Sequence, residues 1–125
     1  MSSLSELVEQ CLAERREFRK NQTRYSPACI ELFRRAFTGD EAAWEAIFLQ
    51  VFQTDIQSYL RTATQLLQEQ RGISLTADEL QDVRQVTQMA FWRFASKRPG
   101  LLHSGEIGPL LQYLKLCAQS GIAQF

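Results

Sequence analysis

The sequence predicts an all-α fold, a compact bundle of about five helices. Only three prolines and six glycines interrupt its 125 residues. They cluster at the ends of segments in which apolar residues recur at helical spacing. A chain of this length buries about two-thirds of its surface on folding, and 45% of its residues are hydrophobic. We therefore expect one compact domain that needs neither a metal ion nor a disulfide to fold.

The first expected helix runs from about Ser3 to Phe18. Its acidic residues come early and its basic residues come late, an order that suits the helix dipole. The basic run extends to Arg24 and would also suit a phosphate, although a solvated helix end is the simpler interpretation. The apolar stripe of this helix consists of Leu4, Leu7, Val8, Cys11 and Leu12.

The second and third expected helices meet at a glycine. Ser26 is the expected N-cap of the second helix and Pro27 its first residue, and Gly39 ends it. Asp40 then caps a third, longer helix, whose polar tail ends near Gly72. The apolar faces carry Ile30, Phe33, Ala36 and Phe37 in the second helix, and Trp44, Ile47, Phe48, Val51, Ile56, Tyr59, Ala63 and Leu66 in the third.

The fourth expected helix, residues 77–98, has two unlike faces. Thr76 and Glu79 form a capping-box pattern at its start, and Lys97 and Arg98 complement the dipole at its end. Its core stripe consists of Leu80, Val83, Thr87, Ala90, Phe91 and Phe94. The opposite side groups, within about 80°, the residues Asp78, Asp82, Gln85, Met89 and Trp92.

Tryptophan and methionine on an outward helix face favour a docking surface. Both residue types are enriched in the buried centres of protein–protein interfaces. The alternative is that the N-terminal helix folds over Trp92 and buries it inside this chain.

The last expected helix begins at the Gly108–Pro109 pair. Opposite its apolar stripe lie Gln112, Lys115 and Gln119. Amides of this kind contact base edges and a lysine contacts phosphate, but three polar residues are also what an ordinary solvated face carries. The apolar stripe consists of Ile107, Leu110, Leu111, Leu114, Cys117, Ala118, Gly121, Ile122 and Phe125.

Composition and spacing exclude several classes of protein. The 14 basic and 14 acidic residues cancel, which excludes a protein that coats polyanions through a large basic excess but leaves room for a local basic patch. No apolar run is long enough to span a membrane, and the N-terminus lacks the features of a signal peptide. Three widely spaced cysteines without a CxxC motif favour a reduced, cytoplasmic protein.

Catalytic, metal and cofactor sites are not expected. His103 has no cysteine near it in sequence, so it is interpreted as a loop histidine. The chain has no nucleotide-binding glycine loop, no HExxH motif and no nucleophile–base pattern, so we expect no enzyme activity. The acidic cluster of Asp78, Glu79 and Asp82 is explained by its position at a helix N-terminus.

Three segments carry a family resemblance. They are Ala-Phe-Thr-Gly-Asp-Glu-Ala-Ala-Trp-Glu-Ala-Ile at 36–47, Asp-Val-Arg-Gln-Val-Thr-Gln-Met-Ala-Phe-Trp-Arg at 82–93, and Tyr-Leu-Lys-Leu-Cys at 113–117. In this order and spacing they resemble region 2 of bacterial RNA polymerase sigma factors of the extracytoplasmic-function type. The resemblance covers about residues 29–125, which suggests a helical extension at 1–25 and a region 2-like domain at 26–125.

The resemblance implies binding rather than chemistry. Sigma region 2 docks on the clamp helices of the polymerase β′ subunit, melts the minus-ten element of promoter DNA and captures flipped bases. The clamp-binding positions of the family correspond to Asp82, Gln85, Gln88 and Trp92, and Met89 joins them on the outward face. RNA polymerase core and promoter DNA are the implied partners, and an anti-sigma or other regulatory protein is a further candidate.

DNA contacts are expected around the loop between the last two helices. Melted bases would stack on aromatic rings or enter pockets in loop 96–107. The resemblance assigns phosphate contacts to Arg93, Lys97 and Arg98, and contacts to the strand or its neighbouring duplex to Gln112, Lys115 and Gln119.

A second hypothesis keeps the scaffold and removes the promoter function. Arg84, Val86 and Gln88 depart from the residues usual in the family, the loop offers no aromatic ring, and the chain stops at Phe125 before any helix-turn-helix. These features suit a sigma-like protein-interaction or regulatory module that does not bind promoters.

Overall fold

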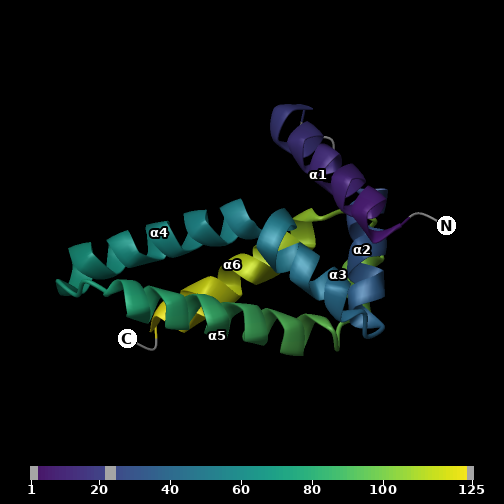
Figure 1. Ribbon diagram of the computed structural model, residues 1–125. Helices are drawn as coiled ribbons and strands as arrows, with labels where there is room; N and C mark the ends of the chain where they lie inside the picture. The colour runs from purple at the N-terminus through teal and green to yellow at the C-terminus, as the bar shows by residue number, and fades with distance from the viewer. Residues whose placement is uncertain (1–2, 22–24, 124–125) are drawn as a thin grey trace. The chain divides into compact units, whose positions relative to one another are not determined.

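The computed structural model describes residues 3–21 and 25–123, and it confirms the all-α class. In this part of the chain the regular elements are helical, apart from one isolated antiparallel bridge between Tyr25 and Glu106. The described residues form six α-helices, one more than the approximate number expected, and Figure 1 labels them. They are α1 (Leu4–Asn21), α2 (Pro27–Phe37), α3 (Glu41–Ala46), α4 (Gln53–Arg71), α5 (Ala77–Ala95) and α6 (Gly108–Ala123), with a π-helix η1 (Ile47–Val51) and a 3-10 helix η2 (Pro99–Leu102).

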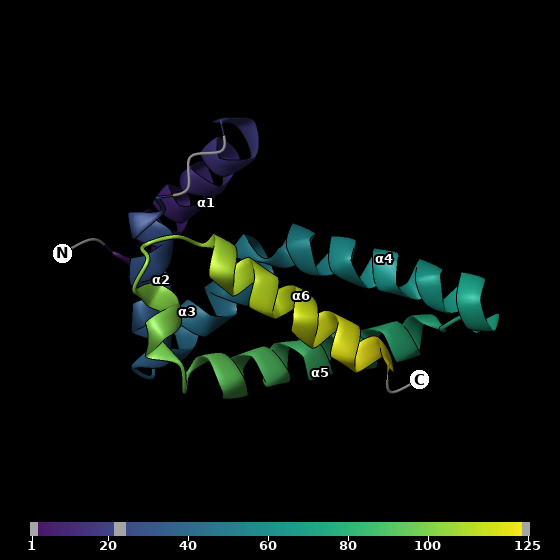
Figure 2. The same ribbon diagram turned by 180° about the vertical axis from the view of Figure 1, so that it is seen from behind.

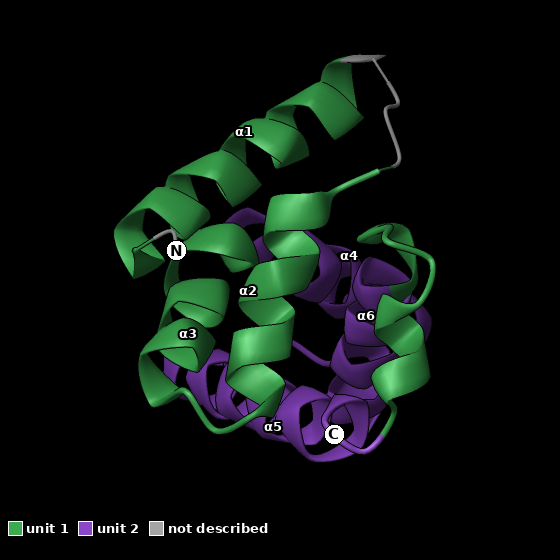
Figure 3. Cartoon of the chain, turned by 90° about the vertical axis from the view of Figure 1, so that its right-hand side faces the viewer, with its two compact units in different colours: residues 1–53, 98–109 green, residues 54–97, 110–125 purple. Residues whose placement is uncertain are grey.

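The chain groups into two compact units, which Figure 3 shows in different colours. Unit 1 comprises Met1–Gln53 and Arg98–Pro109, and unit 2 comprises Thr54–Lys97 and Leu110–Phe125. The N-terminal helix α1 belongs to unit 1, where it packs against α2 and η1. None of the helices described here combines the length and apolar character that crossing a bilayer requires.

Five aromatic rings in unit 1 form a closed chain of contacts. Neighbouring ring centroids are 5.3–6.4 Å apart, the separation at which aromatic pairs add stability beyond the area they bury. The rings come from α2, α3, η1 and the residue after η1, so they hold these elements together. They are Phe33, Phe37, Trp44, Phe48 and Phe52.

The prediction of a single long helix after Asp40 is wrong, because the π-helix η1 interrupts the segment between α3 and α4. The amide of Phe52 donates to the carbonyl of Ile47 at 2.7 Å, a five-residue step that inserts one extra residue into the helical turn. The spacing of the predicted apolar face changes at the same place. After Val51 its next residue is Ile56, five positions further on, whereas a regular helix would place it three or four positions on. The break lets Phe48 and Phe52 both reach the aromatic chain of unit 1.

The helices α2, α3 and α5 begin where the sequence predicts, but the side chain that caps α2 is not the predicted one. Asp40 caps α3 by accepting from the amide of Ala43, and the capping box of Thr76 and Glu79 is present at α5. Pro27 opens α2, but the Ser26 side chain makes no cap bond there. The carboxylate of Glu14 in α1 replaces it and accepts from the first amides of α2 at 2.9 and 3.0 Å. A negative charge at a helix N-terminus is favourable, so Glu14 fastens α1 to α2.

A disulfide joins the same two helices. Cys11 of α1 and Cys29 of α2 are bonded and fully buried, which corrects the expectation of three reduced cysteines. The pair could not be predicted from a local motif, because 18 residues separate the two cysteines in the sequence. Cys117 in α6 is the remaining cysteine; it is buried, and burial raises the pKa of its thiol.

Unit 2 is built on α4 and α5, which run antiparallel, with α6 lying across one side of the pair (Figure 1 and Figure 2). Phe91 of α5 contacts Tyr113 of α6, with ring centroids 6.0 Å apart. Further along, a Cβ added at Gly121 would lie 3.3 Å from the Thr87 hydroxyl and 3.4 Å from a Val83 methyl. The glycine therefore allows α6 to approach α5 closely.

Most of the predicted core is buried or half-buried, and Leu66 and Phe94 are the two predicted core residues of the described chain that are exposed. Leu66 is 47% exposed and Phe94 is 43% exposed, whereas Leu60, Leu67 and Ala95 are buried. In α4 the buried row runs through Ile56, Leu60 and Leu67, which leaves Leu66 beside this row and exposed. The apolar stripe predicted for the last helix is buried from Ile107 to Ile122. Its last member, Phe125, lies outside the described residues, as does Arg24 at the end of the predicted basic run.

The disulfide gives a direct chemical prediction. Alkylation of the unfolded chain without reductant should label one cysteine, Cys117, and reduction beforehand should expose all three. In the folded protein, labelling of Cys117 should be slow at pH 8, because its raised pKa and burial leave little reactive thiolate. Mass spectrometry after iodoacetamide treatment measures both.

The same link should stabilise unit 1. Replacing both Cys11 and Cys29 by alanine should lower the free energy of unfolding by about 3 kcal/mol, since the closed loop restricts the unfolded chain. Denaturant titration with and without reductant provides the control, because reductant should weaken the wild type and leave the double variant unchanged. Three labelled thiols in the unreduced wild type would show that the pair is not bonded.

Candidate functional site

The candidate site is built on α5, whose start is fixed by its capping box. The Thr76 hydroxyl accepts from the amide of Glu79 at 3.1 Å, and the Glu79 carboxylate accepts from the amide of Thr76 at 3.0 Å. Two backbone donors are satisfied by these bonds, and the first turn is anchored. The rotational position of every later side chain in α5 follows from this start.

One side of α5 is committed to the core. Val83, Thr87, Phe91 and Ala95 are at most 1% exposed. The hydroxyl of Thr87 donates to the carbonyl of Val83 at 2.8 Å, which allows a polar residue in this row. Steps of four residues turn the row by about 40° each time. By the end of the helix the buried side has therefore rotated away from Phe94, which explains its unexpected exposure.

The opposite side of α5 carries the predicted polymerase-binding residues, and four of the five are exposed. We call this set the docking face; it consists of Asp82, Gln85, Gln88, Met89 and Trp92. Met89 is 60% exposed and Trp92 is 51% exposed, whereas Gln88 is half-buried at the edge. A large apolar pair is thus presented outward beside a carboxylate and two amides.

The alternative that Trp92 is buried inside this chain is wrong. Trp92 keeps half of its surface exposed, and α1 packs against α2 and η1. The leucine and valine stripe of α1 is used in that packing, where Leu7 and Val8 are buried.

The predicted phosphate-binding residues near the end of α5 fall in different elements. Arg93 is exposed in the last turn of α5. Lys97 and Arg98 are also exposed, but α5 ends at Ala95, so neither is in the helix as expected. The amide of Lys97 closes the helix end by donating to the carbonyl of Phe94 at 3.3 Å. Lys97 belongs to unit 2 and Arg98 to unit 1.

The polar face of α6 is exposed as predicted, and two of its residues line a groove. Gln112, Lys115 and Gln119 are all exposed. Lys115 and Gln119 share a groove of about 250 Å³ with α4, where sequence reasoning had placed Tyr59 and Leu66 in the core. Tyr59 is half-buried, so an aromatic ring lies in the same groove as the lysine. The signal that could have found it is the position of Tyr59 at the edge of the apolar face.

The loop after α5 also acquires an aromatic neighbour that the sequence did not indicate. Tyr25 is 68% exposed and pairs with Glu106, while the amide of Ser26 donates to the carbonyl of Gly105 at 2.9 Å. Gly105 has a φ of +70°, and a Cβ there would lie 3.0 Å from the Tyr25 ring. The loop therefore packs against an exposed tyrosine from far earlier in the chain.

Metal ligands are not gathered anywhere in residues 3–21 and 25–123. No group of three histidine, cysteine or carboxylate side chains there is placed to hold an ion. His103 is exposed at the end of η2.

The two faces of α5 give a stability prediction. Phe91→Ala should lower the free energy of unfolding by about 3–5 kcal/mol, because a fully buried ring is removed and a cavity remains. Trp92→Ala should cost less than half of that, since the indole is half exposed. Denaturant unfolding of both variants measures the difference, and equal losses would place Trp92 in the core.

Comparisons with protein-family models, with curated proteins and with solved structures found no match for this chain. The resemblance to sigma region 2 therefore stands on the three sequence segments, and the binding roles it implies are proposals.

Proposed function

We propose that this chain is a sigma-factor-like region 2 module that binds the β′ clamp of RNA polymerase and minus-ten promoter DNA in transcription initiation. The observation that carries the proposal is the exposure of Met89 and Trp92 on the docking face, directly beside the buried Phe91. A soluble helix gains nothing from presenting this pair to water, whereas a protein partner would cover it.

The docking face has the composition of an interface centre. A tryptophan in such a position commonly contributes more than 2 kcal/mol to binding. Asp82 lies within the same exposed row and can accept charge-assisted hydrogen bonds from an arginine or lysine of the clamp. Gln85 offers both a donor and an acceptor beside it. No group of this surface is arranged for acid–base or nucleophilic work, so the proposed role is binding.

The DNA half of the proposal is supported by two aromatic residues near predicted contacts. Tyr59 shares a groove with Lys115 and Gln119, which combines a ring, a cation and an amide in one place. Tyr25 stands exposed against the loop at Gly105. Base stacking on aromatic rings, together with phosphate contacts from lysine or arginine, is the general mode of single-strand binding. We propose Tyr25 and Tyr59 as the stacking residues.

A module with these partners would act in the cytoplasm. Cellular thiols keep most disulfides reduced there, so the Cys11–Cys29 bond is unusual for that compartment. Both sulfur-bearing residues are fully buried, which slows attack by an external thiol. An anti-sigma or other regulatory protein is a candidate partner for the α1 surface.

The second candidate function is a sigma-like interaction or regulatory module without promoter binding. Two observations favour it. The basic and acidic residues balance across the chain, and Val86 is 41% exposed where the family usually carries a glutamate. A neutral protein receives little of the electrostatic attraction that draws DNA-binding proteins to a polyanion.

Capture by the clamp tests the first function. The wild type should be retained by an immobilised β′ clamp-helix fragment, and Trp92→Ala should weaken binding about thirtyfold, the equivalent of a 2 kcal/mol hot spot. Leu116→Ala is the matched control, because Leu116 is 52% exposed on α6 and lies outside the docking face. If wild type, Trp92→Ala and an unrelated helical protein are retained equally, polymerase binding is excluded.

Binding to single-stranded minus-ten DNA separates the two candidates. The sigma-like function predicts an affinity that falls as salt rises, and Lys115→Gln should reduce the slope of log affinity against log salt by about 0.7. Tyr59→Leu should weaken binding by removing a stacking ring while keeping the apolar bulk. Fluorescence anisotropy at two salt concentrations measures these effects, and absent or salt-insensitive binding supports the regulatory module.

A further inference from the structure

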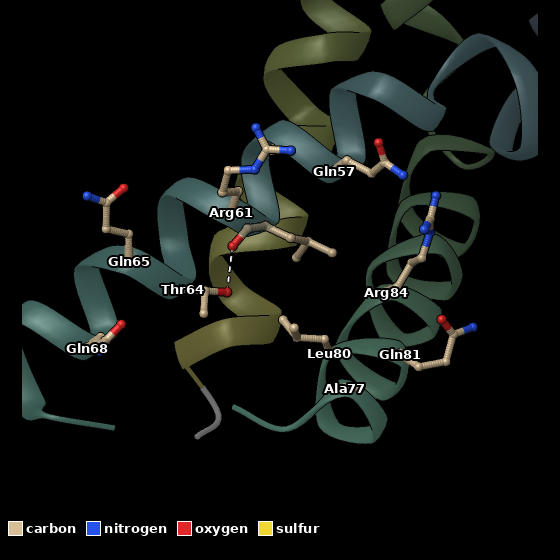
Figure 4. A pocket seen from close by; sticks show the side chains of 10 residues that line it. Gln57, Arg61, Thr64, Gln65, Gln68, Ala77, Leu80, Gln81 and Arg84 are labelled. Atoms are coloured by element: carbon tan, nitrogen blue, oxygen red, sulfur yellow. Dashed lines mark hydrogen bonds between the residues drawn. The ribbon is translucent and has the colours of Figure 1, made fainter. Parts of the chain in front are cut away.

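A groove of about 640 Å³ lies between α4 and α5, entirely within unit 2 (Figure 4). On α5 its residues are centred about 95° around the helix from the docking face, so the centres of the two surfaces are distinct. Gln81 of the groove and Gln85 of the docking face are one turn apart, which makes the surfaces neighbours. The groove is lined by Gln57, Leu60, Arg61, Thr64, Gln65 and Gln68 of α4 and by Ala77, Leu80, Gln81 and Arg84 of α5.

The two charged residues of the groove, Arg61 and Arg84, lie on its two walls toward one end, and its leucines and amides line the rest. Because the helices are antiparallel, Arg84 lies at the same end as Gln57, and Figure 4 shows both side chains extending into the space between the helices. Arg61 is one turn further along α4. At the other end Leu80 points toward Thr64, whose hydroxyl already donates to the backbone at 2.6 Å.

The charged groups of the groove are of one sign. None of its lining residues is acidic, and neither Arg61 nor Arg84 is paired with a carboxylate within residues 3–21 and 25–123. The neighbouring carboxylate of Glu69 accepts from the Gln65 amide at 3.2 Å. A ligand with negative charge near the arginines and apolar groups along the leucines would complement this lining.

We propose that this groove binds an amphipathic helix of a partner protein, with carboxylates spaced one turn apart at one end and aliphatic side chains beyond them. The stretch of α4 that lines the groove, 57–68, is about 17 Å long, the length of a three-turn helix. Arginine recognises a carboxylate through two parallel hydrogen bonds. Seating a helix between two others is a recurrent mode of recognition. The inference does not depend on the proposed polymerase or DNA binding.

Two other occupants fit less well. A nucleic acid strand would find no aromatic lining residue to stack on, and the end with Leu80 and Ala77 carries no basic residue to hold a phosphate. A second copy of this chain, docked groove to groove, would bring no carboxylate to the arginines, because none of the lining residues is acidic.

The test uses the full chain and two designed probes. The first is a fluorescent helical peptide of about 18 residues with two glutamates one turn apart, followed by leucines at helical spacing. The second carries lysine in place of both glutamates. We expect the glutamate peptide to bind, and we expect the affinity of the lysine peptide to be lower by about tenfold or more. Fluorescence anisotropy measures both affinities, and added salt should reduce the difference.

Variants locate the binding. Arg61→Gln with Arg84→Gln should weaken binding of the glutamate peptide about tenfold, whereas Arg16→Gln with Lys20→Gln removes the same charge from exposed positions of α1 and should change little. Ala77→Glu adds a charge inside the groove at an exposed first-turn position, where the helix dipole favours a carboxylate, and Ala77→Gln is its neutral match. The glutamate should weaken peptide binding relative to the glutamine.

Failure of the glutamate peptide to bind, equal binding of both peptides, or equal affinities for the arginine and α1 double variants would each overturn the proposal. A single-stranded DNA probe that binds in an Arg61- and Arg84-dependent manner while the glutamate peptide does not would assign the groove to nucleic acid instead. Trp92→Ala should leave peptide binding unchanged, which separates this groove from the docking face.

Discussion

The row of buried residues along α5 is the constraint on which the candidate site depends. Phe91 meets Tyr113 of α6, and Gly121 brings α6 close to Thr87 and Val83. Apolar contacts of this kind supply most of the stability of a small helical unit. Once this side of α5 is fixed against α6, the helical repeat leaves the opposite side facing outward, and Met89 and Trp92 cannot be drawn into the same core.

Unit 1 is held by a different set of interactions. The closed chain of aromatic rings ties α2, α3 and η1 together, and the π-helix supplies the extra residue that brings Phe52 into it. Glu14 and the Cys11–Cys29 disulfide then attach α1 to α2 by a charge at a helix end and by a covalent bond. The N-terminal helix is therefore an integral part of this unit and brings its own exposed surface to it.

Two surfaces of α5 carry opposite chemistry at close range. The docking face presents an indole and a thioether beside a carboxylate, which suits a partner with apolar and basic groups. The groove with α4 presents arginines and amides around a leucine, which suits an acidic one. One helix can thus serve two partners of unlike charge, because its buried row occupies only a part of its circumference.

The sequence by itself determined the features that depend on neighbours along the chain. Caps at Asp40 and Thr76, the helical stretches between the glycines and prolines, and the outward position of Trp92 all follow from local hydrogen bonding and the helical repeat. Only the tertiary structure decided the features made by distant residues. The Cys11–Cys29 bond, the cap that Glu14 provides, the place of Tyr25 beside Gly105, and the exposure of Leu66 and Phe94 are of this kind. Each depends on which helix packs against which, and neither residue spacing nor helix propensity encodes that choice.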